Sequence, residues 1–209
     1  FVQTTTWKGN QISNERYQPD SQQKTGALLR FPSSANTIQL KVGISFISSL
    51  KARENVWNEI PHWSFEDTRQ ALLAQWENLL QRIDIASNTP EKYKRMFYTG
   101  IYHTMLMPVD RTGENPLWSD PEPYDDFYAI WDTYRTSTPL ITLIDPQRET
   151  DIVRSLINIY KRDGYMPDAR SGNCNGRTQG GSNAEIVIAD AFVKGLPNID
   201  YHLALEAML

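Results

Sequence analysis

The sequence predicts an α+β protein, in which the end of a sheet domain is followed by a toroid of paired helices. Apolar residues recur at every second position up to about residue 48, and with the 3.6-residue period of helices from Ser49 onward. The connections between the later helices alternate between long and short, which is typical of repeated helical hairpins. We therefore divide the chain into a sheet segment at 1–48, a linker helix at 49–63 and the first hairpins of a helical domain at 64–209.

The first segment has the pattern of β structure. Strand-like runs lie at 1–7 and 26–31, on either side of a polar stretch. The run at 37–48 has the clearest pattern, because its apolar side chains alternate with polar or small ones, which predicts a strand with one buried face. The apolar members are Ile38, Leu40, Val42, Ile44 and Phe46.

Two long helices with apolar faces are predicted next. Ser64 is placed to cap the first, and Thr89 with Pro90 starts the second, which ends at Pro108. The helical spacing of their apolar residues predicts that both are core helices. These residues are Phe65, Leu72, Leu73, Trp76, Leu79, Leu80 and Ile83 in the first, and Tyr93, Met96, Phe97, Ile101 and Met105 in the second.

Proline, glycine and capping residues mark the later helices. A third helix is predicted from about Phe127 to Ile144, with Pro139 as a kink or break. A fourth is expected to begin at Pro146 and end before Gly164.

Two further helix starts are predicted near the end of the chain. Ser182 and Glu185 have the spacing of a capping box, for a helix that ends at Gly195. Asp200 is placed to cap the helix that follows.

The two long connections, at 108–126 and 164–181, form the candidate functional region. In antiparallel hairpins, alternating long and short connections put both long ones at the same end of the helical layer. Loops longer than about 12–15 residues in a compact domain are usually functional or disordered. We expect Trp131, Asp132 and Glu185 to approach one another at this end.

The composition favours a neutral ligand. The net charge is −4, and Lys and Arg are scattered, which disfavours nucleic acid or an anionic membrane as a partner. No apolar run reaches the about 20 residues that span a bilayer, so no membrane insertion is expected. Cys174 is the single cysteine, which excludes an internal disulfide framework and a cysteine-rich metal site.

Trp131 and Asp132 have the chemistry of a sugar site. The apolar face of a pyranose ring stacks on indole, and its hydroxyl groups donate to carboxylates. The alternative is core packing of the tryptophan, with the aspartate as a helix cap or ion-pair partner.

The contents of the long loops allow two interpretations each. The first loop carries Asp110, Glu114, Asp120, Glu122, Asp125 and Asp126, which suit calcium or sugar binding or a solvated acidic loop. The second is rich in Gly and Asn, and its Asp168, Arg170, Arg177 and Gln179 suit hydroxyl or anion binding or a plain structural loop.

The order and spacing of several motifs resemble glycoside hydrolase family 92, the calcium-dependent exo-acting α-mannosidases. The motifs are FYTGIYHTMLMP, YDDFYAIWDTYRTSTPLITLIDP, SLINIYKRDGYMPDA and QGGSNAEIVIADAFVKGL. The resemblance implies an N-terminal β-sandwich followed by an (α/α)6 barrel. It also implies inverting hydrolysis of terminal mannose in mannose-containing glycans, a calcium ion held against sugar hydroxyls, and a secreted or extracytoplasmic location.

The resemblance assigns Asp132 to a sugar-hydroxyl contact in the terminal mannose subsite, with Trp131 and Asp126 nearby. The general base and the main metal ligands belong to motifs that follow Leu209 in the family. We accordingly expect the chain to be a segment of a longer protein, which fits its start in a strand-like run and its end in a helical pattern.

The general acid differs from the family pattern. Many members carry a Glu where Asn175 stands at or near the aligned position. Either Asp168 replaces it, or the leaving group needs no proton, as in a mannose 1-phosphate linkage with Arg177 and Gln179 binding the phosphoryl oxygens. A carbohydrate-binding helical module without catalysis is a further alternative.

Overall fold

The computed structural model describes residues 3–18, 22–119, 121–176, 180–181 and 183–209. The chain forms two compact units, residues 1–42 and residues 43–209, and each is described by itself. Together they contain helices and small sheets, as expected for a mixed α and β chain. Among the described residues, each helix is too short or too polar to cross a membrane.

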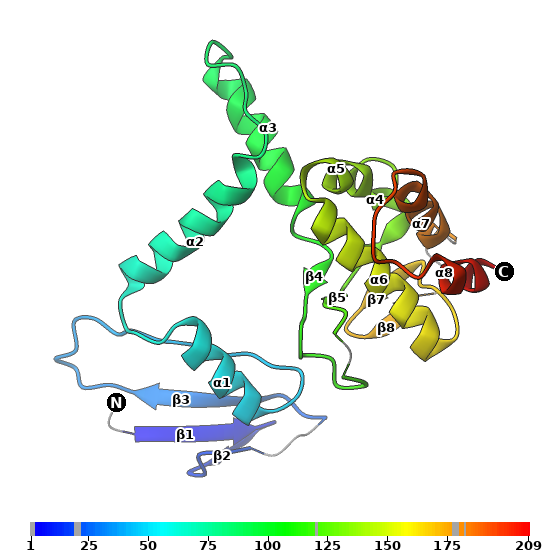
Figure 1. The fold of residues 1–209 in the computed structure, drawn as a ribbon. Helices are drawn as coiled ribbons and strands as arrows, with labels where there is room; N and C mark the ends of the chain where they lie inside the picture. The colour runs from blue at the N-terminus through cyan, green and yellow to red at the C-terminus, as the bar shows by residue number, and fades with distance from the viewer. Residues whose placement is uncertain (1–2, 19–21, 120, 177–179, 182) are drawn as a thin grey trace. The chain divides into compact units, whose positions relative to one another are not determined.

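The first unit contains a three-stranded antiparallel sheet in the order β2-β1-β3 (Figure 1). The strands are β1 Gln3–Lys8, β2 Gln11–Ser13 and β3 Thr25–Arg30. Gly26 lies opposite Trp7, and a Cβ atom at Gly26 would come within 2.5 Å of the indole. Glycine is therefore required there for the two strands to pair.

The predicted strand at 37–48 is wrong. No described segment pairs with these residues, and the structure assigns no strand between 31 and 48. Ile38, Leu40, Val42, Ile44 and Phe46 are between 53% and 74% exposed. The alternating pattern indicates one face suited to burial, but a strand also needs a neighbour that accepts and donates its backbone hydrogen bonds.

The second unit begins with three helices: α1 Ser49–Glu59, α2 Phe65–Leu80 and α3 Glu91–Thr104. The oxygen of Ser48 caps α1 by accepting from the Lys51 amide at 3.1 Å. The predicted cap of α2 is confirmed, since Ser64 accepts from the Asp67 amide at 3.2 Å. Pro90 precedes α3 directly, as predicted.

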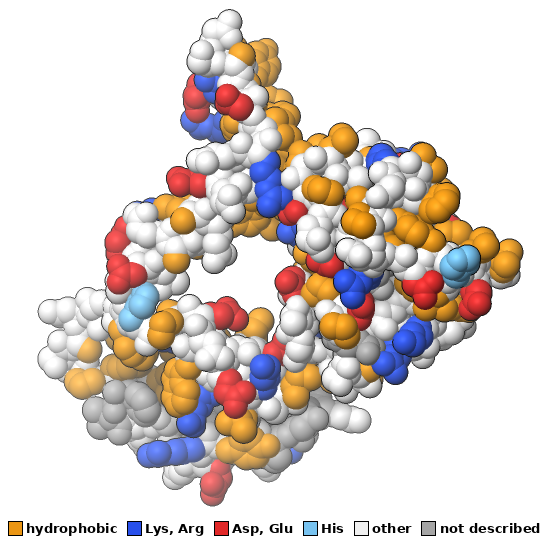
Figure 2. Space-filling model, in the orientation of Figure 1, with side chains coloured by type: hydrophobic (Ala, Val, Ile, Leu, Met, Phe, Trp, Pro, Cys, Tyr) orange, Lys and Arg blue, Asp and Glu red, His pale blue; other side chains and the backbone are white. Residues whose placement is uncertain are grey.

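The expectation that α2 and α3 are core helices is wrong for the described part of the chain. No residue of α2 is buried, and in α3 only Ile101 is. Phe65 is 75% exposed and Met96 is 61% exposed, and Figure 2 shows hydrophobic side chains on the surface of both helices. A helix pair buries little more than the seam between its members, where the Trp76 and Tyr102 ring centroids lie 4.6 Å apart.

The core lies around α6 Pro146–Asp163, which packs against α5 Ser137–Ile144, α7 Ala184–Val193 and α8 Tyr201–Met208 (Figure 1). The predicted limits of α6 are confirmed: Pro146 is its first residue, and Gly164 follows it with φ +81°. The buried residues of this core include Ile141, Ile152, Val153, Leu156, Val187, Ile188, Ala191 and Ala204.

The predicted third helix is divided. Tyr128–Ala129 forms strand β6, and two helices follow, α4 Ile130–Thr133 and α5. The break between the two helices precedes Pro139, which lies in the first turn of α5. Proline causes no kink at this position, because the backbone amides of the first turn have no intrahelical partner to lose.

The starts of the last two helices differ in their caps. Asp200 caps α8 as predicted, by accepting from the Leu203 amide at 3.0 Å. Asn183 precedes α7 and makes no side-chain cap, while Ser182 of the predicted capping box lies outside the described residues. Gly195 follows α7 with φ +72°.

Short strands occupy the two long connections. Strand β4 Val109–Asp110 pairs with β5 Tyr124–Asp125, and β6 pairs with β7 Ala169–Ser171, which pairs in turn with β8 Cys174–Gly176. The strands described after Pro61 have at most three residues, as the helical period predicts.

Candidate functional site

The two long loops meet at the three-stranded sheet β6-β7-β8, in which β6 directly follows the first loop and β7 and β8 belong to the second. Tyr128 is paired with Arg170 and Ala129 with Ala169, in antiparallel register. The Ile130 amide donates to the Asp168 carbonyl oxygen at 3.1 Å, so the start of α4 is attached to the same sheet. The meeting of the long loops, inferred from the alternation of loop lengths, is present in the structure.

Arg170 lies at the centre of this junction. Its side chain is 0% exposed, and its Nε donates to both carboxylate oxygens of Asp125, at 3.1 and 3.0 Å. Its Nη1 donates to Asp163 Oδ2 at 3.0 Å and to Asn175 Oδ1. The Asn175 amide nitrogen donates to the same Asp163 oxygen at 2.9 Å. These partners, which we call the Arg170 cluster, compensate the burial of Nε and Nη1, whereas Nη2 is buried without a hydrogen-bond partner.

Asp126 lies beside this cluster in a left-handed conformation, with φ +56°. One carboxylate oxygen accepts from the Gly172 amide at 2.7 Å, and the other accepts from Arg111 Nη1 at 3.2 Å. Arg111 is buried, and its guanidinium carbon lies 3.7 Å from the centroid of the Phe46 ring. Each oxygen of Asp126 keeps a further lone pair, so the carboxylate can also accept from a ligand hydroxyl.

Tyr128 is strained and exposed. Its φ is +55°, a region that costs a bulky residue about 1–3 kcal/mol. Its side chain is 62% exposed and borders two hollows, of about 300 and about 350 Å³. Asp126, Ser171 and Gly172 are among the residues of the first hollow, and Cys174, Asn175 and Gly176 are among those of the second.

Trp131 and Asp132 lie on the surface at the start of α4. Trp131 is 40% exposed, and Asp132 is exposed. Gly180 packs against the indole, since a Cβ atom there would lie 2.7 Å from Trp131 Cγ. The second long loop therefore contacts the indole at Gly180, where the space admits no side chain larger than hydrogen.

The other residues singled out in the sequence have different surroundings. Asp168 is buried, with 6% of its surface exposed. Asn175 belongs to the Arg170 cluster, where both ends of its amide are engaged within the protein. Glu185, expected near Trp131, lies in the first turn of α7 with its Oε2 buried. Arg177 and Gln179 lie outside the described residues.

From the sequence, Arg170 was predicted only as a loop residue suited to hydroxyl or anion binding, and no role was predicted for Arg111 or Tyr128. The Arg170 cluster joins residues 45 positions apart, and such a pairing has no period or local motif. An arginine in one long loop, with aspartates in both, is the signal that the sequence offers, and it does not identify the partners.

The described residues do not fit a calcium site by themselves. Within the described ranges, no group of three or more His, Cys, Asp and Glu side chains is placed to hold a metal ion. Asp125 and Asp126, the most closely spaced carboxylates of the acidic loop, are paired with arginines.

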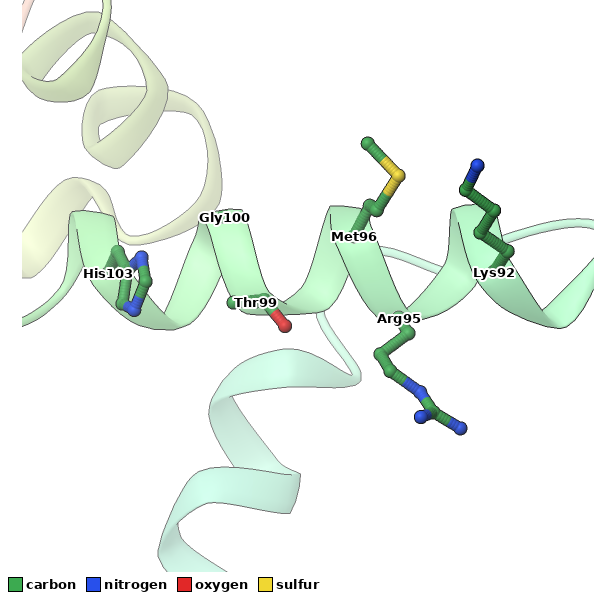
Figure 3. Close-up of a pocket in the computed structure, with 6 residues that line it drawn as sticks. All are labelled: Lys92, Arg95, Met96, Thr99, Gly100 and His103. Atoms are coloured by element: carbon green, nitrogen blue, oxygen red, sulfur yellow. The ribbon is translucent and has the colours of Figure 1, made fainter.

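A further hollow, of about 710 Å³, lies along α3, and its lining includes no residue of this junction. Figure 3 shows that its lining residues all come from one helix. A surface of one helix does not bring together groups from different segments, as a binding site does. Its lining residues are Lys92, Arg95, Met96, Thr99, Gly100 and His103.

Comparison with known proteins places the chain among glycosidases. Residues 51–209 match the model of the glycosyl hydrolase family 92 catalytic domain. A protein of Arthroderma benhamiae named as an uncharacterized secreted glycosidase is 38% identical over 194 residues, which cover 89% of this chain and 22% of the relative.

Two solved structures resemble the chain over 99% of its length and 29% of theirs. One is a family GH92 inverting mannosidase from Bacteroides thetaiotaomicron, with 26% identity and a TM-score of 0.78. The other is the gh92 family glycosyl hydrolase ccman5, with 23% identity and a TM-score of 0.70, which supports the fold alone. The chain thus spans less than a third of the length of each of these proteins.

Proposed function

The chain belongs to glycosyl hydrolase family 92, and from this membership we propose that the full-length protein removes terminal α-linked mannose from glycans with inversion at the anomeric carbon. The family match over 51–209 carries the proposal. The likeness to a structure named as an inverting mannosidase supports the substrate and the stereochemistry. The name of the Arthroderma relative supports secretion.

The proposed fold of the full-length protein is a β-sandwich followed by an (α/α)6 barrel. In this arrangement β1, β2 and β3 belong to the sandwich, and the helices from α2 onward belong to the barrel. The order of the elements supports this division, because the two six-residue strands precede α1 and the later strands have at most three residues each.

Trp131 and Asp132 are proposed to bind the terminal mannose. The exposed indole offers a flat apolar face to the sugar ring, and the exposed carboxylate offers acceptors to its hydroxyls. Asp126 is proposed to assist through its remaining lone pairs. The Arg170 cluster holds the loops that carry these residues, so its part in binding is positional.

Inverting hydrolysis needs two carboxyl groups about 6.5–9.5 Å apart, one to protonate the leaving oxygen and one to activate water. Asp168 is the proposed acid, since it is a carboxyl group in the loop where the family carries its Glu. The base is proposed to come from the part of the family sequence that follows position 209. Calcium also stays a proposal from the family resemblance.

A second proposed substrate class is a mannose 1-phosphodiester, whose phosphate leaves as a stable anion without a general acid. Asn175 favours this alternative, because its neutral amide, held by Arg170 and Asp163, has no proton to give. Arg177 and Gln179 are the proposed phosphoryl ligands.

The stereochemistry of the first product tests the function. The full-length protein is incubated with 4-nitrophenyl α-mannoside, and the anomeric proton of released mannose is followed by NMR from the earliest times. Early β-mannose supports the proposal, and early α-mannose contradicts inversion. Binding of mannose with no turnover of any α-mannoside or mannose 1-phosphodiester would favour a non-catalytic carbohydrate-binding module.

A further inference from the structure

Tyr128 keeps its strained conformation because its neighbours impose it. Phe127 and Ala129 on either side are each only 5% exposed. The backbone of Tyr128 is also paired with that of Arg170, whose side chain is fixed in the buried cluster. These contacts leave the Tyr128 ring on the surface, at 62% exposure. Strain of this kind concentrates at binding and catalytic sites.

The surroundings of the ring have the chemistry of a sugar subsite. The two hollows beside Tyr128, of about 300 and about 350 Å³, are of the size of small-molecule sites. One offers the Asp126 carboxylate, the other offers Asn175, and both offer Ser171. An aromatic face with hydroxyl, amide and carboxylate groups at its edge matches a pyranose, which has apolar faces and a rim of hydroxyls.

The position of Tyr128 along the chain identifies which sugar it would contact. It precedes Trp131 by three residues, so their Cα atoms are separated by at most about 11 Å. In the proposed function, Trp131 and Asp132 hold the terminal mannose. For an enzyme that removes terminal residues, every other sugar of the substrate lies on the leaving-group side of the cleaved bond.

We propose that Tyr128 is the aromatic platform of a second sugar subsite, which binds the sugar on the leaving-group side. This inference rests on the proposed function and extends it to the specificity for the leaving group. Tyr128 acts in it as a binding residue that selects substrates with a second ring.

Kinetic specificity of the full-length protein tests the platform. The substrates are α-mannobiose or mannose-1-phospho-6-mannose, which have a second ring, and α-mannosyl fluoride, which has none. In Tyr128→Ala, the ratio of kcat/KM for the two-ring substrate to that for the fluoride should fall about tenfold or more. Tyr93→Ala, on an exposed tyrosine of α3, should leave the ratio unchanged.

Two further variants separate the role of the ring from an effect on folding. Tyr128→Gly accepts φ +55° without strain and removes the ring, so it should fold at least as well and show the same fall in the ratio. Tyr128→Phe keeps the ring and should retain the ratio within about threefold. An unchanged ratio in folded Tyr128→Gly overturns the proposal.

Cys174 gives a measurement that does not depend on turnover. It is an exposed free thiol and lines the 350 Å³ hollow beside Tyr128. A thio-linked α-mannobiose, which is not hydrolysed, should slow alkylation of Cys174 by iodoacetamide at least threefold, as followed by mass spectrometry of the peptide that contains it. This protection should be lost in Tyr128→Gly and kept in Tyr93→Ala.

The outcomes distinguish the two proposals. Protection that depends on Tyr128, without turnover of any mannoside, supports the subsite and contradicts the hydrolase. Turnover of the mannosides with neither protection nor a change in the ratio supports the hydrolase and overturns the subsite.

Discussion

Arg170 donates from Nε to both carboxylate oxygens of Asp125, at 3.1 and 3.0 Å, and this pair joins the two long loops. The pair is buried, with side-chain exposures of 0% and 8%. A buried ion pair adds little net stability compared with a well-packed apolar pair, but removal of one partner leaves an unpaired buried charge. The pair therefore makes the conformation of the loops depend on both residues.

Arg170→Ala is expected to lower the free energy of unfolding by about 3–5 kcal/mol, because it leaves Asp125 buried without its main partner. Thermal unfolding of the full-length protein measures the effect. Arg95→Ala is the matched control, since Arg95 is 78% exposed and its ion pair with Glu91 is long, at 3.9 Å. Equal losses in the two variants would contradict a special role of the Arg170 cluster.

Glu149 is expected to make stability fall as pH rises. It is 1% exposed, and burial, followed by the nearby charge of Asp190, raises its pKa from 4.5 to about 8, against the smaller effects of Lys194 and Arg148. The unfolded carboxyl loses its proton near pH 4.5, whereas the folded one keeps it until about pH 8. The contribution of Glu149 to the free energy of unfolding is therefore fully present below pH 4.5 and is lost as the pH rises from 4.5 to about 8. The total loss above pH 8 is up to about 5 kcal/mol.

Glu149→Gln should remove this dependence, because the amide stays neutral. In urea unfolding, the variant should be more stable than the parent at pH 8 by about 2–5 kcal/mol, and close to it at pH 5. Glu206→Gln, at an exposed position of α8, should unfold like the parent at both pH values. A parent whose stability is the same at pH 5 and pH 8 would show that Glu149 ionises freely in the fold.

Gly180 and Gly181 form a matched pair for testing the packing behind Trp131. Both have positive φ, +93° and +87°, so alanine strains the backbone at either position. Only at Gly180 would the new Cβ also meet the indole, at 2.7 Å from Cγ, whereas nothing lies within 4 Å at Gly181. Overpacking of this kind costs about 1–3 kcal/mol and should displace the indole. We therefore expect Gly180→Ala to raise KM for an aryl α-mannoside at least about fivefold more than Gly181→Ala does. Equal KM values in the two variants would contradict the proposed role of Trp131 in binding the substrate.

Local signals in the sequence predicted the limits of several helices. The residues that mark these limits act through hydrogen bonds or backbone angles that involve only the adjacent helical turn. They are Ser64, Pro146, Gly164 and Asp200. Such interactions form whatever the rest of the chain does, which is why a single sequence predicts them.

Several features that depend on distant partners were not predicted correctly. The run from Ile38 to Phe46 has the period of a strand, but no described segment pairs with it. The apolar face of α2 has helical spacing, but none of its side chains is fully buried. Arg170 finds Asp125, Asp163 and Asn175 only after the loops fold together. The pattern of a segment indicates which face can be buried, and the partner decides whether it is.

Asp132→Ala is expected to lower kcat/KM for a terminal α-mannoside by at least about 100-fold in the full-length protein. A lost hydrogen bond between a charged group and the substrate in a desolvated site costs about 1.5–3 kcal/mol or more. Folding should be retained, because the residue is exposed at the start of α4. Circular dichroism checks the fold, and full activity in the variant would count against the assignment of Asp132.

The identity of the general acid predicts how the rate depends on the leaving group. If Asn175 stands where a proton donor is usual, an aryl α-mannoside or a mannose 1-phosphodiester should be cleaved much faster than α-mannobiose, whose alkoxide must be protonated as it departs. Arg177→Ala should then slow the phosphodiester more than the aryl glycoside, through lost charge-assisted hydrogen bonds worth about 1.5–3 kcal/mol. The opposite result would identify Asp168 as the acid. In that case the parent protein cleaves mannobiose as fast as the activated substrates, and Asp168→Asn abolishes the cleavage of mannobiose alone.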